Sequence, residues 1–196
     1  MTDVEDVRAR ILDKARELLL TRGYSQMTME ALGGELRMSK KTLYRVFPSK
    51  EALGEAVIAA YFADVGEELA GLRHREDLDF DARLRLYVKT IAGHYHRGAR
   101  ALEELQREAP ALWKTLLEVR RRAVQDNFGA LVTLGVRAGA FRSDVEPRLL
   151  LRMMLTLVDQ LLRPDVQAEL DLSTERIFTH MMDVLLDGLR TDRATG

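Results

Sequence analysis

The chain has 196 residues and no cysteine, with 30 basic and 31 acidic side chains and a formal net charge of −1. The missing cysteines exclude disulfides, thiolate metal sites and a cysteine nucleophile. The near-zero net charge gives no global indication of a nucleic-acid partner. No apolar run approaches the ~18 residues of a membrane span, so we expect a cytoplasmic protein with no membrane partner. Abundant Leu, Ala, Glu and Arg favour helix throughout.

Four helices are expected in the first part of the chain, because apolar residues recur there at spacings of three and four. Their approximate limits are residues 4–22, 29–36, 40–47 and 50–72. Thr28, Ser39 and Ser49 stand directly before the last three, where a hydroxyl can accept from the free N–H groups of a helix start. Gly33 and Gly34 weaken the second helix by about 1 kcal/mol each relative to alanine, so packing must hold it.

Five more helices and no strand are expected in the remainder of the chain. Their approximate limits are residues 80–97, 99–108, 110–138, 147–163 and 174–189. All four prolines fall at helix edges, where a residue without an N–H group is tolerated. The chain is therefore expected to be all-α, with about nine helices. We place a first domain at residues 4–65 and a second at residues 66–196.

The second and third helices, joined by a turn of about three residues, have the dimensions of a helix-turn-helix motif at about residues 28–47. In this motif the second helix enters the major groove of DNA. Leu43 and Phe47, four residues apart, are expected to face inward and anchor it. From Arg37 to Lys50 there are five basic and no acidic residues, so the rest of the chain carries −6. A solvated basic corner without a partner is the alternative interpretation of this charge.

The side chains around the start of the third helix have the chemistry of DNA contacts. Lys40 and Lys41 can neutralise phosphates or donate to guanine O6 and N7. Thr42 offers a hydroxyl for a phosphate and a methyl group for a thymine, and Tyr44 offers a phenolic donor. Lys50 begins the fourth helix, where free N–H groups and the helix dipole attract anions. The segment is therefore expected to contact phosphates at two helix starts.

Residues 28–53, TMEALGGELRMSKKTLYRVFPSKEAL, resemble the signature of TetR-type (TetR/AcrR-like) transcriptional regulators. Residues 11–24, ILDKARELLLTRGY, resemble the first helix of that family, and residues 139–147, GAFRSDVEP, resemble more weakly the loop before its eighth helix. The sequence departs from the family at Arg37, where a turn glycine is common, and at Gly33, where alanine is usual. Arg37 can adopt a left-handed conformation at a cost of about 1–2 kcal/mol, or make one more phosphate contact.

The resemblance implies an N-terminal three-helix DNA-binding domain and a C-terminal helical domain for ligand binding and dimerisation. The DNA contacts would be Lys40, Lys41, Thr42, Tyr44 and Lys50, with Thr28 reaching the backbone and Ser39 at the same helix end. A homodimer would read a palindromic operator in double-stranded DNA. A small-molecule effector would swing the fourth helix and change the spacing of the two recognition helices. The expected function is a ligand-responsive transcriptional regulator, a repressor released by its effector.

The eighth and ninth expected helices, residues 147–163 and 174–189, are apolar on most faces. Such helices are buried on most faces, which favours a dimer interface that forms a four-helix bundle, with an ordinary monomer core as the alternative. A ligand pocket is expected between the fifth to eighth helices. Its candidate lining residues are Tyr87, Ile91, His94, Tyr95, Trp113, Phe128, Met153 and Met154. The same stripe of aromatic and Met residues also fits a plain core.

No set of acids, bases or metal ligands in the sequence predicts catalysis. His94 and His96 are two apart on a helix and point to different faces, and no histidine has a glutamate three residues before it. Phosphate-binding glycine loops, zinc-protease patterns and nucleophile elbows are missing. We therefore expect no enzyme, no cofactor and no metal. The alternative function is an all-α small-molecule-binding protein without sequence-specific DNA binding.

Overall fold

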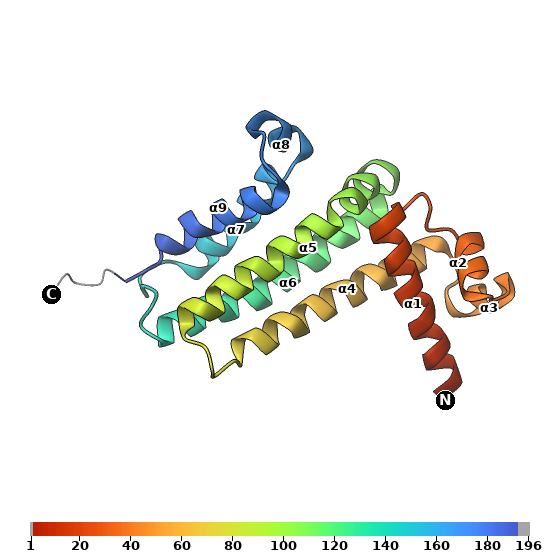
Figure 1. Ribbon diagram of the computed structural model, residues 1–196, viewed down its shortest axis with the longest axis horizontal. Helices are drawn as coiled ribbons and strands as arrows, with labels where there is room; N and C mark the ends of the chain where they lie inside the picture. The colour runs from red at the N-terminus through yellow and green to blue at the C-terminus, as the bar shows by residue number, and fades with distance from the viewer. Residues whose placement is uncertain (1, 192–196) are drawn as a thin grey trace. The chain divides into compact units, whose positions relative to one another are not determined.

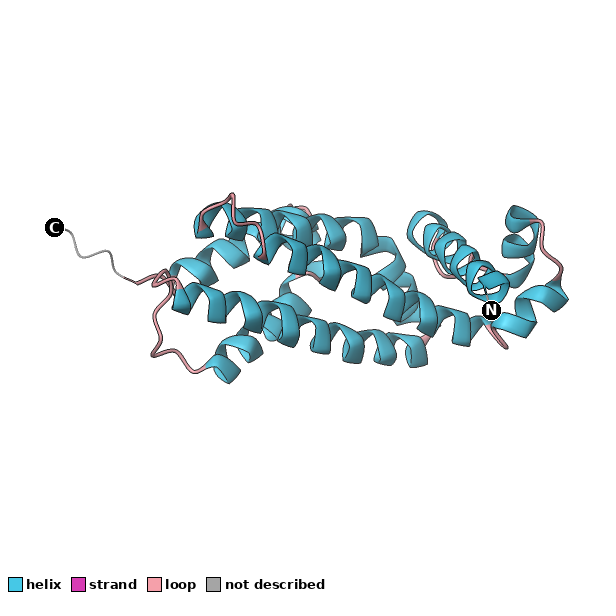
Figure 2. Cartoon of the chain, turned by 90° about the horizontal axis from the view of Figure 1, so that it is seen from below, coloured by secondary structure: helices cyan, strands magenta, loops and turns pink. Residues whose placement is uncertain are grey.

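The computed structural model describes residues 2–191, without the side chains of residues 2, 3, 99, 100 and 164. Within that range the chain forms nine helices and no strand, which confirms the all-α class (Figures 1 and 2). The helices are α1 (Thr2–Arg22), α2 (Met29–Leu36), α3 (Lys40–Val46), α4 (Lys50–Arg73), α5 (Phe80–Glu108), α6 (Pro110–Arg137), α7 (Pro147–Leu161), α8 (Pro164–Leu170) and α9 (Thr174–Asp187). No helix in this part of the chain is long and apolar enough to cross a bilayer.

Two expected boundaries differ from the structure. α5 is continuous, so the expected division into helices 80–97 and 99–108 is wrong. Gly98 favours a break by about 1 kcal/mol relative to alanine, but it is buried inside the helix, where packing decides. α8 occupies a stretch to which no helix was assigned, and its C-cap residue, Asp171, has a left-handed φ of 52°. One expected helix is lost and one unexpected helix is gained, so the number of helices in the described range is the expected one.

The described chain divides into two compact units. The first contains the described part of Met1–Val65 together with Arg97–Arg120, and the second contains Gly66–His96 with the described part of Arg121–Gly196. The expected domains, residues 4–65 and 66–196, remain a prediction. The end of α5 and the start of α6 belong to the first unit.

One hydrophobic core holds the first unit together. Its buried members include Ile11, Leu18, Leu32, Leu43, Phe47, Leu53, Leu105 and Leu112. Leu43 and Phe47 are only 0% and 4% exposed, so their expected role as inward anchors of α3 is confirmed. A Cβ atom on Gly54 would lie 2.8 Å from Leu112 Cδ1. The glycine therefore allows α4 and α6 to pack closely behind α2 and α3.

The second unit has its own core, in which α5, α6, α7 and α9 take part. Its buried members include Leu84, Tyr87, Phe128, Leu131, Leu150, Met154, Val158, Phe178 and Met182. The loop after α6 is fixed to the segment after α9, because the Arg142 N–H donates to the Leu189 carbonyl at 2.8 Å. In the same way the Thr191 N–H donates to the Ala140 carbonyl at 3.2 Å. These bonds fix one wall of a cavity in this unit.

Candidate nucleic-acid interface

The turn between α2 and α3 is built on Arg37, whose φ of 53° and ψ of 40° are left-handed. Its N–H group donates to the Gly34 carbonyl at 3.4 Å, and the Met38 N–H donates to the Gly33 carbonyl at 3.0 Å. This pair of bonds is the Schellman helix ending, which usually takes a glycine. The expectation that Arg37 tolerates a left-handed turn is confirmed. A Cβ on Gly33 would lie only 3.0 Å from the Met38 carbonyl oxygen, so this glycine permits the tight turn.

The three helix starts that surround this turn are capped by side chains, as the sequence predicted. The hydroxyl oxygens of Thr28, Ser39 and Ser49 accept from the backbone N–H groups of Ala31, Thr42 and Ala52, at 3.1, 3.1 and 3.0 Å. The hydroxyls of Ser39 and Thr42 also lie 2.9 Å apart in a second hydrogen bond. Each cap stabilises its helix by about 1 kcal/mol. The start of α3 is therefore ordered before any partner is bound.

The exposed face of α3 carries the basic and aromatic side chains. Lys41 and Arg45 are exposed and, being four apart, share one side of the helix. Tyr44 is 47% exposed, which is high for an aromatic side chain. Lys40 forms an exposed ion pair with Glu30 of α2, and this hydrogen bond raises the pKa of Lys40 and lowers the pKa of Glu30. Any phosphate that approaches Lys40 must compete with Glu30.

Lys50 occupies the first position of α4, and its Nζ lies 3.9 Å from the centre of the Tyr24 ring. Burial lowers the pKa of Lys50, although nearby glutamates raise it. Tyr24 follows Gly23, which has a φ of 88° at the end of α1. The nearly buried Glu104 of α5 accepts from the backbone N–H and the hydroxyl of Ser25, both at 3.3 Å. The loop between α1 and α2 is thus held by Lys50 through Tyr24 and by Glu104 through Ser25.

All seven expected DNA contacts belong to the first unit; six lie at the starts of α2, α3 and α4, and Tyr44 lies further along α3. Three residues that influence this surface were not in the expected contact set. Arg45 was included in the charge count, and its spacing from Lys41 could have identified it. Glu30 and Glu104 were missed, because their partners are distant in sequence and only the fold brings them together.

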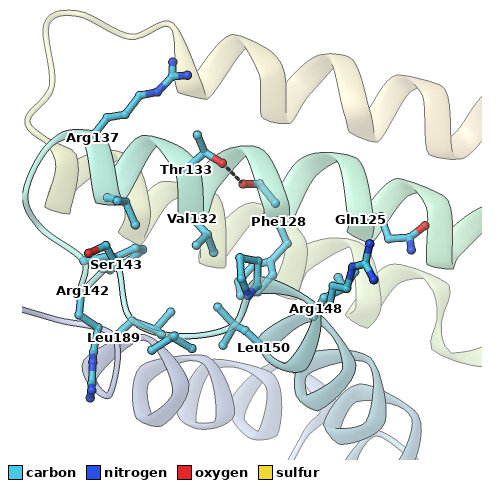
Figure 3. Close-up of a pocket in the computed structure, with 16 residues that line it drawn as sticks. Gln125, Phe128, Val132, Thr133, Arg137, Arg142, Ser143, Arg148, Leu150 and Leu189 are labelled. Atoms are coloured by element: carbon cyan, nitrogen blue, oxygen red, sulfur yellow. Dashed lines mark hydrogen bonds between the residues drawn. The ribbon is translucent and has the colours of Figure 1, made fainter.

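A cavity of about 530 Å³ lies in the second unit, between α6, the following loop and the start of α7 (Figure 3). Of the eight residues expected to line a ligand pocket, Phe128 lines this cavity. Tyr87 and Met154 are buried, and burial raises the pKa of Tyr87. Met153 is 45% exposed. Trp113 packs against the core of the first unit.

The remaining three expected pocket residues lie on α5 and are half-buried: Ile91, His94 and Tyr95. His94 Nε2 lies 2.9 Å from Glu68 Oε2 of α4, and the Tyr95 ring centre lies 5.2 Å from that of Phe178. Among the described side chains, no group of three or more His, Asp or Glu is placed to hold a metal ion. The eight residues therefore do not meet around one cavity.

Comparison with known proteins gives one consistent result. Residues 11–57, which contain the whole candidate interface, match the family described as bacterial regulatory proteins, tetR family. The HTH-type transcriptional regulator UidR of Escherichia coli K12 is 28% identical over 196 residues, covering 97% of this chain and 96% of UidR. The HTH-type transcriptional repressor DhaR of Mycobacterium sp. GP1 is 25% identical over 148 residues, 74% of each chain. In fold, the chain is similar to a putative TetR-family regulator from Mesorhizobium loti, with a TM-score of 0.73, 16% identity and coverage of 97% and 100%.

Proposed function

Because the chain belongs to the TetR family of transcriptional regulators, we propose that it is a repressor that binds a palindromic operator as a homodimer in the cytoplasm. A small-molecule effector releases it from DNA. The observation that carries the proposal is the capped, basic start of α3, exposed on a helix-turn-helix in a chain whose remainder is acidic. Net positive charge confined to one motif is the electrostatic footprint of a DNA-reading surface.

The contacts follow from the positions of the side chains. Lys41, Tyr44 and Arg45 lie on the exposed side of α3 and reach into the major groove. On DNA binding, Lys40 leaves its ion pair with Glu30 and pairs with a phosphate instead. Lys50 reaches a phosphate from the start of α4, where free N–H groups add to its charge. Among the residues at the helix starts, Thr28, Ser39 and Thr42 direct hydroxyls toward the DNA backbone.

The dimer forms through α7 and α9, which correspond to the expected eighth and ninth helices. Apolar side chains remain exposed on both helices: Leu149 is 57%, Met153 45% and Val184 77% exposed. Exposed apolar residues on two packed helices support burial against a second copy. A four-helix bundle from two copies would cover them and set the distance between the two recognition helices.

The effector binds in the second domain, residues 66–196, which carries ligand binding and dimerisation. The cavity beside Phe128 supports this assignment, since its size is that of a small-molecule site. The other seven expected residues do not line this cavity, so Phe128 is the expected lining residue that this proposal keeps. Because α4 contributes to both units, a ligand that displaces its second half would move the first half as well.

Selection of binding sites from a random duplex pool, followed by a mobility-shift assay, tests this function. We expect a palindromic consensus sequence. A duplex with two half-sites should be bound more tightly than a duplex with one. The variant Lys41→Ala should weaken binding, whereas Lys89→Ala, an exposed lysine in the second unit, should not. The alternative function, a small-molecule-binding protein without sequence-specific DNA binding, predicts no enriched site and no shift.

A further inference from the structure

The cavity in the second unit has an apolar lining with basic residues at its edge (Figure 3). Its apolar side chains come from α6, the following loop, α7 and the segment after α9: Phe128, Val132, Val136, Phe141, Leu150 and Leu189. Three arginines also line it, and no acidic residue does. An apolar cavity with a few polar groups is the usual form of a small-molecule site, and a lining whose charges are all positive favours an anion.

The three arginines are not equivalent. Arg142 donates to both carboxylate oxygens of Asp144, at 2.7 and 2.5 Å, so its charge is already balanced. Arg137 points away from the other lining side chains in Figure 3. Arg148, at the start of α7, lies at the same end of the cavity as Gln125 of α6 and forms no ion pair within residues 2–191. Arg148 is therefore the cation that remains for a ligand.

The other acidic residue of this loop does not remove that charge. Glu146 accepts from the backbone N–H of Arg148 at 3.2 Å and so caps α7. The guanidinium of Arg148 is left with its fork of N–H donors exposed. Such a fork matches a carboxylate in a bidentate geometry, and the amide of Gln125 can add one further donor.

We propose that this cavity binds a small anionic amphiphile, with its apolar body against α6 and α7 and its carboxylate at Arg148 and Gln125. This names the chemical class of the effector, so its regulatory meaning rests on the proposed function, whereas the binding itself does not. At about 30 Å³ for each water-sized group, the cavity of about 530 Å³ takes at most roughly 18 non-hydrogen groups. Decanoate is within that limit and serves as the probe.

The test is isothermal titration calorimetry of the full chain with decanoate, decanol and decyltrimethylammonium, with decanol below its solubility limit and the two ions below their micelle concentrations. We expect decanoate to bind at least roughly tenfold more tightly than the other two, as a charge-assisted hydrogen bond provides. Arg148→Gln should weaken decanoate binding roughly tenfold and leave decanol unchanged. Arg137→Gln is the matched control, because it removes the same charge from the edge of the cavity but should not weaken decanoate binding.

A second variant separates loss of the site from loss of the fold. Gly129 lines the cavity from α6, and a Cβ there would meet nothing within 4 Å. Leucine at this position fills the space and favours the helix, so Gly129→Leu should abolish decanoate binding while the melting temperature stays equal or rises. Unchanged binding of decanoate to Gly129→Leu would show that the ligand does not occupy this cavity.

Two further results would also overturn the inference: equal binding of the three probes, and equal losses in the two arginine variants. Tight binding without release of a selected DNA site would refute the effector role alone. If no DNA site is selected at all, the proposed function fails, and the titration still decides whether the cavity takes anionic amphiphiles.

Discussion

At Arg37 a charged side chain holds a left-handed backbone conformation that glycine adopts without strain. The substitution Arg37→Gly should relieve about 1–2 kcal/mol of strain and lose about 0.5–1 kcal/mol to chain entropy. We therefore expect a net gain of about 0.5–1 kcal/mol in the free energy of unfolding, measured by urea denaturation. Arg45→Gly, inside α3, is the control and should lose about 1 kcal/mol. Destabilisation by both variants would contradict the assigned turn.

The ion pair between Lys40 and Glu30 gives a second prediction at this scale. Glu30→Gln removes the competitor of the phosphate, so operator affinity at low salt should rise roughly two- to fivefold. The control is Glu35→Gln, which removes the same charge from the same helix but frees Arg22 of α1 instead. Binding assays that give equal affinities for the two variants would show that the pairing of Lys40 is irrelevant.

The sequence was informative for those residues whose structure depends on near neighbours. The caps at Thr28, Ser39 and Ser49 act over three residues, and the inward position of Leu43 depends only on helical spacing. The contact of Glu104 with Ser25 joins residues 79 apart, and no local pattern specifies it. Partners of this kind depend on the packing of α5 beside the loop after α1.

Among the elements, α2 tests how packing and helix propensity combine. Gly34 has nothing within 4 Å of a Cβ position, whereas a Cβ on Gly33 meets the Met38 carbonyl oxygen at 3.0 Å. Gly34→Ala should therefore stabilise the chain by about 1 kcal/mol. Gly33→Ala should gain clearly less, or destabilise, because the turn must shift. Thermal unfolding of both variants checks this, and an equal gain for the two would contradict the close approach.

Helix limits were predictable where sequence punctuation and packing agree, as at α2 and α3. They were not predictable at Gly98, where a local helix breaker is buried in a continuous helix. The short α8 was also missed, because Pro164 suits both the end of one helix and the start of the next. The cavity was harder still to predict, since it depends on a loop fixed by its bonds to the segment after α9.

For the whole molecule, the proposed dimer gives a prediction with a matched control. Met153→Glu and Val184→Glu place charges on exposed apolar sites of α7 and α9 and should convert the dimer into monomers. Leu170→Glu changes a similarly exposed leucine, 46% exposed on α8, and should leave the dimer intact. Light scattering after size exclusion measures the mass of each variant. A dimer that survives both substitutions would place the interface elsewhere.

The proposed DNA-binding surface holds phosphates at the basic starts of α3 and α4. The most direct test is the salt dependence of operator affinity for the unchanged chain and for Lys50→Ala. We predict a linear fall of log affinity with log salt, with a slope of about −0.9 for each phosphate contacted. Lys50→Ala should reduce the size of that slope by roughly one for each protomer and weaken binding to all DNA sequences about equally. An affinity that changes neither with salt nor with this substitution would show that these helix starts do not bind phosphates.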